Sequence, residues 1–122
     1  MKIYSFEKLL VWQKSRKLAL VIYKTTIEFP KEEVFGMTSQ MRRCCISIAS
    51  NIAEGSGRQT YKEKARFTEI AYASALELLN QLMISLDLEY IKEESYIKLR
   101  TEIEEITFML DALRKSQINN EG

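Results

Sequence analysis

The chain has no histidine among its 122 residues, and this absence excludes several classes of enzyme. Without histidine there are no Ser-His or Cys-His nucleophile pairs and no metal sites with an imidazole ligand. The Glu-x-x-His motifs of di-iron helical bundles are missing for the same reason, as is the arginine-histidine site of helical ribonucleases. We therefore expect a protein that is not an enzyme, with no catalytic residue, no cofactor and no metal ion.

Residues that form turns are also scarce, because the chain has one proline and four glycines. An all-β fold needs a turn roughly every 8–12 residues, so this composition favours helices. The chain is 46% hydrophobic and 29% charged, which is typical of a globular protein. Its length is that of one ordinary domain, which we expect to span residues 1–122.

Long hydrophobic runs are missing as well. A membrane-spanning helix needs about 20 mostly apolar residues, and the longest apolar runs here are a few residues long. The first ten residues also lack the sustained apolar core of a secretory signal. These features predict a cytoplasmic protein without membrane contact. The two cysteines, Cys44 and Cys45, are adjacent, and we interpret both as small residues of the core.

Hydrophobic residues recur at helical spacing through most of the chain. The pattern predicts helices over about residues 6–28, 38–55, 61–88 and 93–117. Thr60 and Glu63 have the spacing of a capping box at the start of the third helix. Four helices joined by short connectors predict an all-α fold, an antiparallel up-down four-helix bundle.

The third predicted helix has an unusually wide hydrophobic face. Its apolar residues fill about half of the circumference, whereas an amphipathic helix needs a stripe of roughly 100°. A four-helix core cannot bury such a face completely, and large exposed apolar patches are unusual in monomers. We therefore expect a homo-oligomer.

A polar stripe follows one side of the second predicted helix. Its members recur at steps of three and four residues: Gln40, Arg43, Ser47, Asn51 and Glu54. Short polar side chains beside Ile and Ala indicate a partly buried network, which must be fully hydrogen-bonded to be stable. The stripe then ties the helix to its neighbours, and this structural role is our main interpretation. The alternative is a binding surface for a polar or anionic ligand.

The positive charge is concentrated in one half of the chain. Residues 1–66 hold 13 Lys and Arg against 6 Asp and Glu, and the balance is reversed in the rest. Such asymmetry indicates a surface for a polyanion, or two halves that pair with each other within or between subunits. The candidate nucleic-acid-binding residues are Lys14, Lys17, Lys24, Arg42, Arg58, Lys62, Lys64 and Arg66.

Four patches of the sequence resemble one known family. Residues 40–55 read Q-x-R-R-x-x-x-S-I-x-x-N-I-A-E-G, and similar patches begin at Phe6, Phe29 and Phe67. Together they resemble the bacterial four-helix-bundle family named for the protein encoded in the intervening sequence of 23S ribosomal RNA genes. Its relatives include the accessory variability protein of diversity-generating retroelements.

The resemblance carries its own expectations. It implies the four-helix bundle and further suggests a ring-shaped homopentamer. The retroelement relatives are thought to bind nucleic acid and a reverse transcriptase through a basic surface, so a reverse transcriptase is a partner here by analogy only. We predict an oligomeric helical protein that binds RNA, DNA or a nucleoprotein partner. The alternative is a structural or protein–protein adaptor that binds no nucleic acid.

Overall fold

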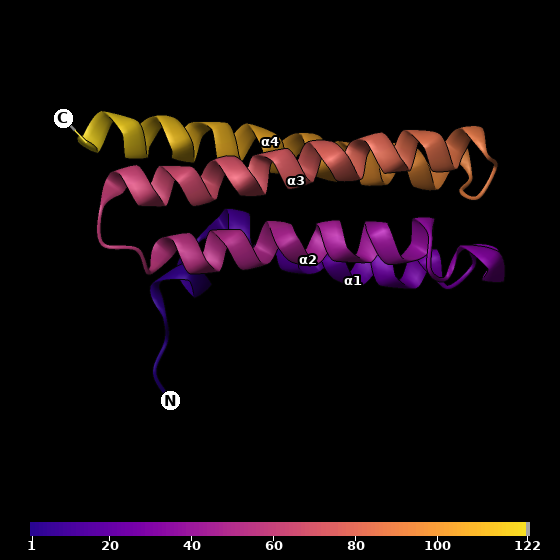
Figure 1. Ribbon diagram of the computed structural model, residues 1–122, viewed down its shortest axis with the longest axis horizontal. Helices are drawn as coiled ribbons and strands as arrows, with labels where there is room; N and C mark the ends of the chain where they lie inside the picture. The colour runs from indigo at the N-terminus through magenta and orange to yellow at the C-terminus, as the bar shows by residue number, and fades with distance from the viewer. Residues whose placement is uncertain (122) are drawn as a thin grey trace.

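The computed structural model describes residues 1–121, which form four α-helices and two short 3-10 helices without any β-strand. The α-helices are α1 (Leu10–Thr26), α2 (Met37–Ser56), α3 (Tyr61–Asp87) and α4 (Glu93–Glu121). The 3-10 helices are η1 (Ser5–Lys8) and η2 (Lys31–Glu33). Each α-helix runs antiparallel to the one before it (Figure 1), which confirms the predicted up-down four-helix bundle.

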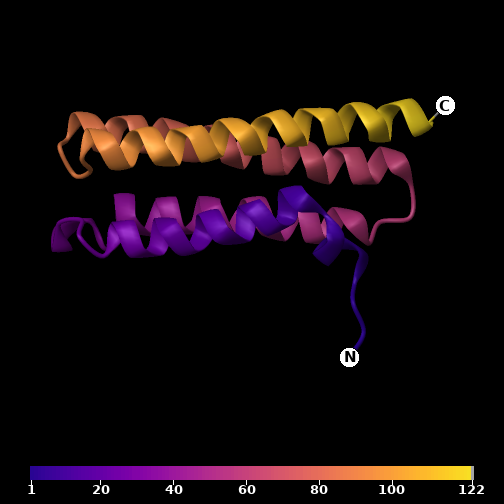
Figure 2. The same ribbon diagram turned by 180° about the vertical axis from the view of Figure 1, so that it is seen from behind.

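The helices pack as two layers. Helices α1 and α2 form one layer, and α3 and α4 form the other (Figure 1). In the view from behind, α1 and α4 are the two helices nearest the viewer, one in each layer (Figure 2). These two helices are in contact. Each helix therefore lies close to its two neighbours around the bundle, and among the described residues the backbones of the diagonal pairs, α1 with α3 and α2 with α4, do not approach each other closely.

The first helix is shorter than predicted. It begins at Leu10 instead of Phe6, because Leu9 is extended, with φ −77° and ψ 122°. The residues before it form η1, where the Tyr4 backbone N–H donates to the Glu7 carboxylate at 2.8 Å. The Phe6 ring then packs edge-on against Trp12, with 4.9 Å between ring centroids.

The other helices start at or within one residue of their predicted positions. Helix α3 begins after Thr60, whose side chain accepts a hydrogen bond from the Glu63 backbone N–H, as the capping spacing indicates. Helix α4 continues to Glu121, past the predicted end at Gln117. The last residue of the predicted domain, Gly122, lies outside the described residues.

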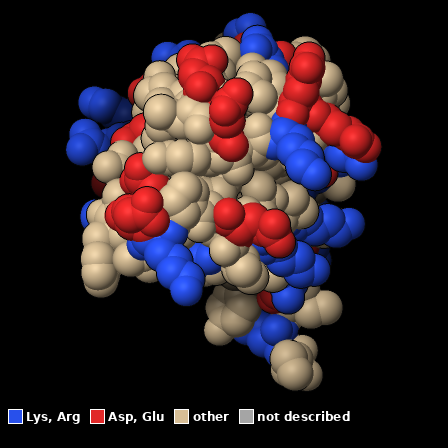
Figure 3. Space-filling model, turned by 90° about the vertical axis from the view of Figure 1, so that its right-hand side faces the viewer, with Lys and Arg blue, Asp and Glu red and all other residues tan. Residues whose placement is uncertain are grey.

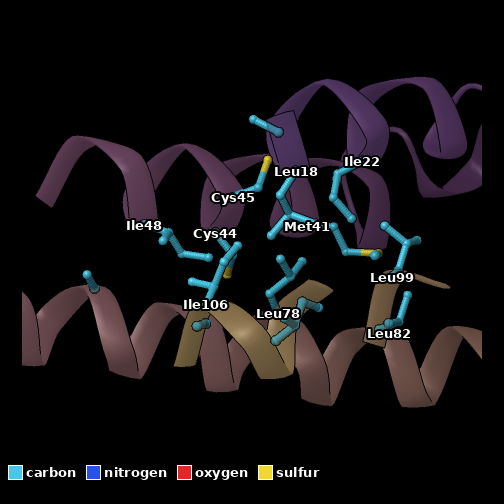
Figure 4. Packing of buried hydrophobic residues seen from close by; sticks show 14 of the residues in the cluster. Leu18, Ile22, Met41, Cys44, Cys45, Ile48, Leu78, Leu82, Leu99 and Ile106 are labelled. Atoms are coloured by element: carbon cyan, nitrogen blue, oxygen red, sulfur yellow. The ribbon is translucent and has the colours of Figure 1, made fainter. Parts of the chain in front are cut away.

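The core lies between the two layers and takes residues from all four helices. Leu18 and Ile22 come from α1, and they meet residues of the other three helices in the cluster shown in Figure 4. The fully buried members include Met41, Cys45, Ile48, Leu78, Leu82, Leu99, Ile103, Ile106 and Leu110. Both cysteines are free thiols buried in this cluster, as predicted.

Gly55 lets α2 approach α3 closely at the end of the bundle near the chain termini. A Cβ atom on Gly55 would lie 2.8 Å from the Cβ of Phe67 on α3, closer than packed carbon atoms allow. The two helices therefore need glycine at this crossing.

Residues 1–121 contain neither a membrane-spanning helix nor a cluster of metal ligands. None of the helices combines the length and the hydropathy that a membrane span requires. Across the same residues, no group of three or more cysteine or acidic side chains is arranged to hold a metal ion.

Candidate nucleic-acid interface

Four of the predicted basic residues lie at the end of the bundle where α2 connects to α3. Arg58 is in the connector, and Lys62, Lys64 and Arg66 are in the first two turns of α3. This end also carries both chain termini (Figure 1). None of the four forms an ion pair within the described part of the chain, although Glu63 lies among them. Residues 56–66 thus carry four positive charges and one negative charge.

Local contacts hold two of these side chains in place. The Arg58 guanidinium lies over the Phe67 ring, 4.4 Å from its centroid. The Lys64 ammonium donates to the carbonyl oxygen of Ser56 at 3.1 Å. The side chains of Lys62 and Arg66 are exposed and make no hydrogen bond within residues 1–121. The four residues form one group, which we call the basic end.

A pocket of about 520 Å³ adjoins the basic end, between the start of α3 and the end of α4. It is lined by Tyr61, Lys62, Glu63, Ala65, Arg66, Glu69 and Ile118. The carboxylate of Glu69 accepts a hydrogen bond from Nε of Arg114 on α4 at 2.9 Å, which fixes one wall. Sequence patterns do not reveal this pocket, because its two walls are about 50 residues apart in the sequence.

The predicted row of lysines on α1 lies elsewhere and faces acidic side chains. The Lys14 ammonium lies 2.8 Å from the Glu105 carboxylate on α4. Lys17 shares a small pocket of about 130 Å³ with Lys14, Glu102 and Glu105. Lys24 is exposed, two turns further along α1. The row of lysines therefore pairs in part with the acidic half of the chain. Such pairing between the two halves was the alternative to a polyanion-binding surface.

Arg42 ties α2 to α1. Its Nε donates to the Thr26 hydroxyl at 2.9 Å, and one terminal nitrogen donates to the Tyr23 carbonyl oxygen at 3.2 Å. The guanidinium also lies 4.6 Å from the centroid of the Tyr23 ring. These contacts use two of the five N–H donors of the guanidinium and hold it against α1. The structure thus separates the eight predicted basic residues into three places instead of one surface.

The neutral members of the polar stripe form a network between α2 and α3. The hydroxyls of Ser47 and Ser74 are 2.8 Å apart. The Asn51 amide donates to the Ser47 carbonyl oxygen at 2.8 Å and to its hydroxyl at 3.1 Å. Gln81, which is 4% exposed, donates weakly to Gln40 at 3.4 Å, and its own carbonyl oxygen has no partner among the described residues.

The charged members of the stripe, Arg43 and Glu54, are exposed and form neither ion pairs nor hydrogen bonds within residues 1–121. Arg43 lines a groove of about 430 Å³ between α2 and α3, and the opposite wall carries Glu77. The other lining residues are Gln40, Cys44, Ser47 and Ser74. Burial, with a smaller contribution from Glu77, raises the pKa of the Cys44 thiol to about 11.

The residues on the α3 side of this groove are not among the site residues predicted from the sequence. Ser74 and Glu77 follow Phe67 and Ala71 in one of the patches that resemble the family, and this spacing was the available signal. Their register against α2 depends on how the two helices pack, which periodicity alone does not give.

The fold and the groove define a class of protein, the small antiparallel helical bundles whose polar residues join neighbouring helices. The chain belongs to the 23S rRNA-intervening sequence protein family, whose sequence pattern matches residues 7–112. A solved structure of a protein with unknown function, from the S23 ribosomal protein family of Bacteroides thetaiotaomicron, is similar to this chain. The two are 28% identical, and the TM-score is 0.79. The match covers 87% of this chain and 99% of the other.

A comparison with curated protein sequences gave no match. The family and the structural relative carry no enzymatic name. The matches concern the intervening-sequence family and give no link to the variability protein of retroelements.

Proposed function

We propose that this protein is a non-enzymatic homo-oligomer that binds nucleic acid through the basic end. The main support is that Arg58, Lys62, Lys64 and Arg66 form a group in which no member makes an ion pair among the side chains that the structure describes. At the opposite end of the bundle, acidic side chains lie among basic ones (Figure 3). The contrast between the two ends favours the basic end as the place where phosphates bind.

The names of the relatives agree with this choice of ligand. The name of the family refers to an intervening sequence of 23S rRNA, and the structural relative is assigned to a ribosomal protein family. Ribosomal RNA is therefore the first nucleic acid to examine. A nucleic-acid-binding protein of this kind acts in the cytoplasm. A reverse transcriptase partner rests on the resemblance alone and stays a prediction.

Salt dependence is the physical test of phosphate binding. Four cations that each neutralise a phosphate of single-stranded RNA give a slope of about −3 in a plot of log affinity against log salt. Fluorescence anisotropy with single- and double-stranded oligonucleotides measures this slope. The absence of binding to every oligonucleotide at low salt would show that the proposal is wrong.

Matched variants locate the binding surface. Replacing Arg58, Lys62 and Arg66 with alanine removes three positive charges from the basic end, and we expect affinity to fall and the slope to become flatter. Replacing Lys31, Lys92 and Lys98 with alanine removes the same charge from exposed positions outside that end, and we expect a much smaller loss. Equal losses in the two variants would mean that only net charge matters.

Exposed hydrophobic residues on α3 support the oligomer. The side chains of Ile70, Leu76 and Ile84 are 39%, 47% and 41% exposed on the outer side of this helix. Covering such residues with another subunit removes apolar surface from water. Light scattering at micromolar concentration measures the mass. A mass of one chain would contradict the oligomer, and a dimer would contradict the pentamer that the resemblance suggests.

The groove between α2 and α3 favours a second candidate function, a protein–protein adaptor. Arg43 and Glu77 face the same groove with opposite charges, and neither forms an ion pair among residues 1–121, so a partner surface with the complementary charges would fit. The two functions differ in their ligand. An adaptor without nucleic-acid binding gives no anisotropy change with any oligonucleotide, and Arg43→Ala weakens its protein complex.

A further inference from the structure

The pocket beside the basic end combines apolar and charged side chains. Its lining combines an aromatic ring, two aliphatic side chains, two cations and two carboxylates in a volume of about 520 Å³. Sites for small molecules have volumes of roughly 300–1,000 Å³. The apolar part consists of Ala65, which is 6% exposed, and of Tyr61 and Ile118, which are 44% and 43% exposed.

The charges of the lining favour a neutral group inside the pocket. The lining carries the cations Lys62 and Arg66 and the carboxylates of Glu63 and Glu69, the latter already paired with Arg114, so a phosphate in the pocket would meet carboxylates as well as cations. A phosphate binds better outside it, where Arg58 and Lys64 add positive charge without an ion-pair partner among the described residues. A nucleic-acid chain can place a neutral base in the pocket and keep the phosphates of its backbone outside, on the basic end.

Tyr61 supplies a surface on which such a base can stack. Stacking of bases on aromatic side chains, beside a positively charged groove, is the usual way in which proteins hold single strands. A base in a duplex cannot enter a pocket unless it leaves its stack and its partner, which costs free energy. The free energy needed to free a base is smaller in a single strand or a bulge, where the base has no pairing partner.

We propose that this pocket accepts one unpaired RNA base, so that the protein prefers single-stranded RNA to a duplex of the same sequence. The inference rests on the proposed function, since it assigns the form of nucleic acid that the basic end binds. Glu63 and Glu69 add a preference among bases. Their carboxylates accept hydrogen bonds from the exocyclic amino groups of adenine, cytosine and guanine, which uracil lacks.

The test uses an RNA oligonucleotide with one 2-aminopurine, alone or annealed to its complement. Anisotropy gives affinity, and the 2-aminopurine fluorescence reports whether that base changes its stacking. We expect the single strand to bind more tightly than the duplex and its 2-aminopurine signal to change on binding. We also expect oligouridine to bind more weakly than oligoadenosine.

Variants of the pocket separate stacking from charge. Tyr61→Ala is expected to weaken single-strand binding by roughly 5- to 150-fold, the range for losing one stacked base, without changing the salt slope. Lys62→Ala is expected to make the slope flatter. The matched controls are Tyr4→Ala and Ile97→Ala, whose side chains are 54% exposed outside the pocket. Ile118→Ala provides a second pocket variant if Tyr61→Ala does not fold.

Each outcome has a clear meaning. Equal binding of single strand and duplex, or full affinity in both Tyr61→Ala and Ile118→Ala, overturns the pocket while the proposed function stands. Binding of neither form of RNA, nor of DNA, overturns both. A preference for single strands that Tyr61→Ala abolishes, while Tyr4→Ala keeps it, supports the pocket.

Discussion

The hydroxyl of Tyr90 donates a 2.7 Å hydrogen bond to the carboxylate of Glu33, which is 57 residues earlier in the chain. The other carboxylate oxygen of Glu33 accepts from the Met37 backbone N–H at 2.9 Å, at the start of α2. One side chain thus joins the α1–α2 connector to the α3–α4 connector. The Phe29 ring lies nearby, with its centroid 5.4 Å from that of Tyr90.

This contact predicts a pH dependence of stability. The hydrogen bond from Met37, followed by that from Tyr90, lowers the pKa of Glu33 below its ordinary value of 4.5. A carboxyl with a lowered pKa in the folded state stabilises the fold above its unfolded pKa. The contribution is lost as the pH falls through the folded pKa. We expect Glu33→Gln to make the melting temperature less sensitive to acid than in the wild type.

The matched control for this prediction is Glu28→Gln, an exposed glutamate in the same region. Thermal melts monitored by circular dichroism between neutral and strongly acidic pH provide the comparison. If Glu33→Gln and wild type lose stability in parallel with falling pH, the contact does not control the acid response.

Gly55→Ala tests the close approach of α2 and α3. The added Cβ would lie 2.8 Å from the Phe67 Cβ, and overpacking of this kind costs about 1–3 kcal/mol. The higher helix propensity of alanine offsets at most about 1 kcal/mol of that cost. We expect a lower melting temperature. Gly57→Ala is the control, because its nearest neighbour, the Glu54 carbonyl oxygen, is 3.6 Å away and no such clash arises.

The hydroxyl pair of Ser47 and Ser74 gives a third prediction. Replacing Ser47 with alanine leaves the Ser74 hydroxyl without its partner in a partly buried site, which costs about 1–3 kcal/mol, whereas in Ser74→Ala the Ser47 hydroxyl keeps the hydrogen bond from Asn51. Replacing both removes the two polar groups together. We expect the double variant to be more stable than the sum of the single effects indicates. Chemical denaturation of the four proteins in this cycle gives the coupling, and strict additivity would show that the pair does not interact.

Arg43→Ala distinguishes a role within the chain from a role between molecules. Arg43 is exposed and has no ion pair among the described residues, so its loss should change the stability of a single chain by less than about 0.5 kcal/mol. If the groove forms part of a subunit interface, the same variant lowers the oligomeric mass in light scattering. A large loss of stability without dissociation would indicate instead that Arg43 supports its own fold.

Helical periodicity was sufficient to predict the fold, because the apolar residues of each helix recur at the spacing that one buried face requires. Periodicity gave the wrong start for the first helix, because the apolar pattern continues through Leu9, although Leu9 is extended and the residues before it form a separate 3-10 turn. No periodic signal marks such a break. The cause lies in local hydrogen bonds, such as the one between Tyr4 and Glu7.

The candidate sites could be predicted less completely. The polar stripe was identified from spacing, and its neutral members do join α2 to α3 through Ser47. The basic residues were identified by type, but their grouping depends on which helices are neighbours. Lys14 faces α4 and Arg42 faces α1, so neither belongs to the basic end. The pocket beside Tyr61 needs Ile118 from α4, which only the folded chain brings near.

The ring of contacts around the bundle has a consequence for how the native state opens. Of the four pairs of neighbouring helices, α1 and α4 share the least extensive contact, and no covalent connector joins them directly. Partial unfolding starts where few contacts must be broken. Opening along this seam would leave α1 held by α2 alone, while α2, α3 and α4 stay packed. Amide protons of α1 should therefore exchange with solvent earlier than those of α3, which packs extensively on both sides.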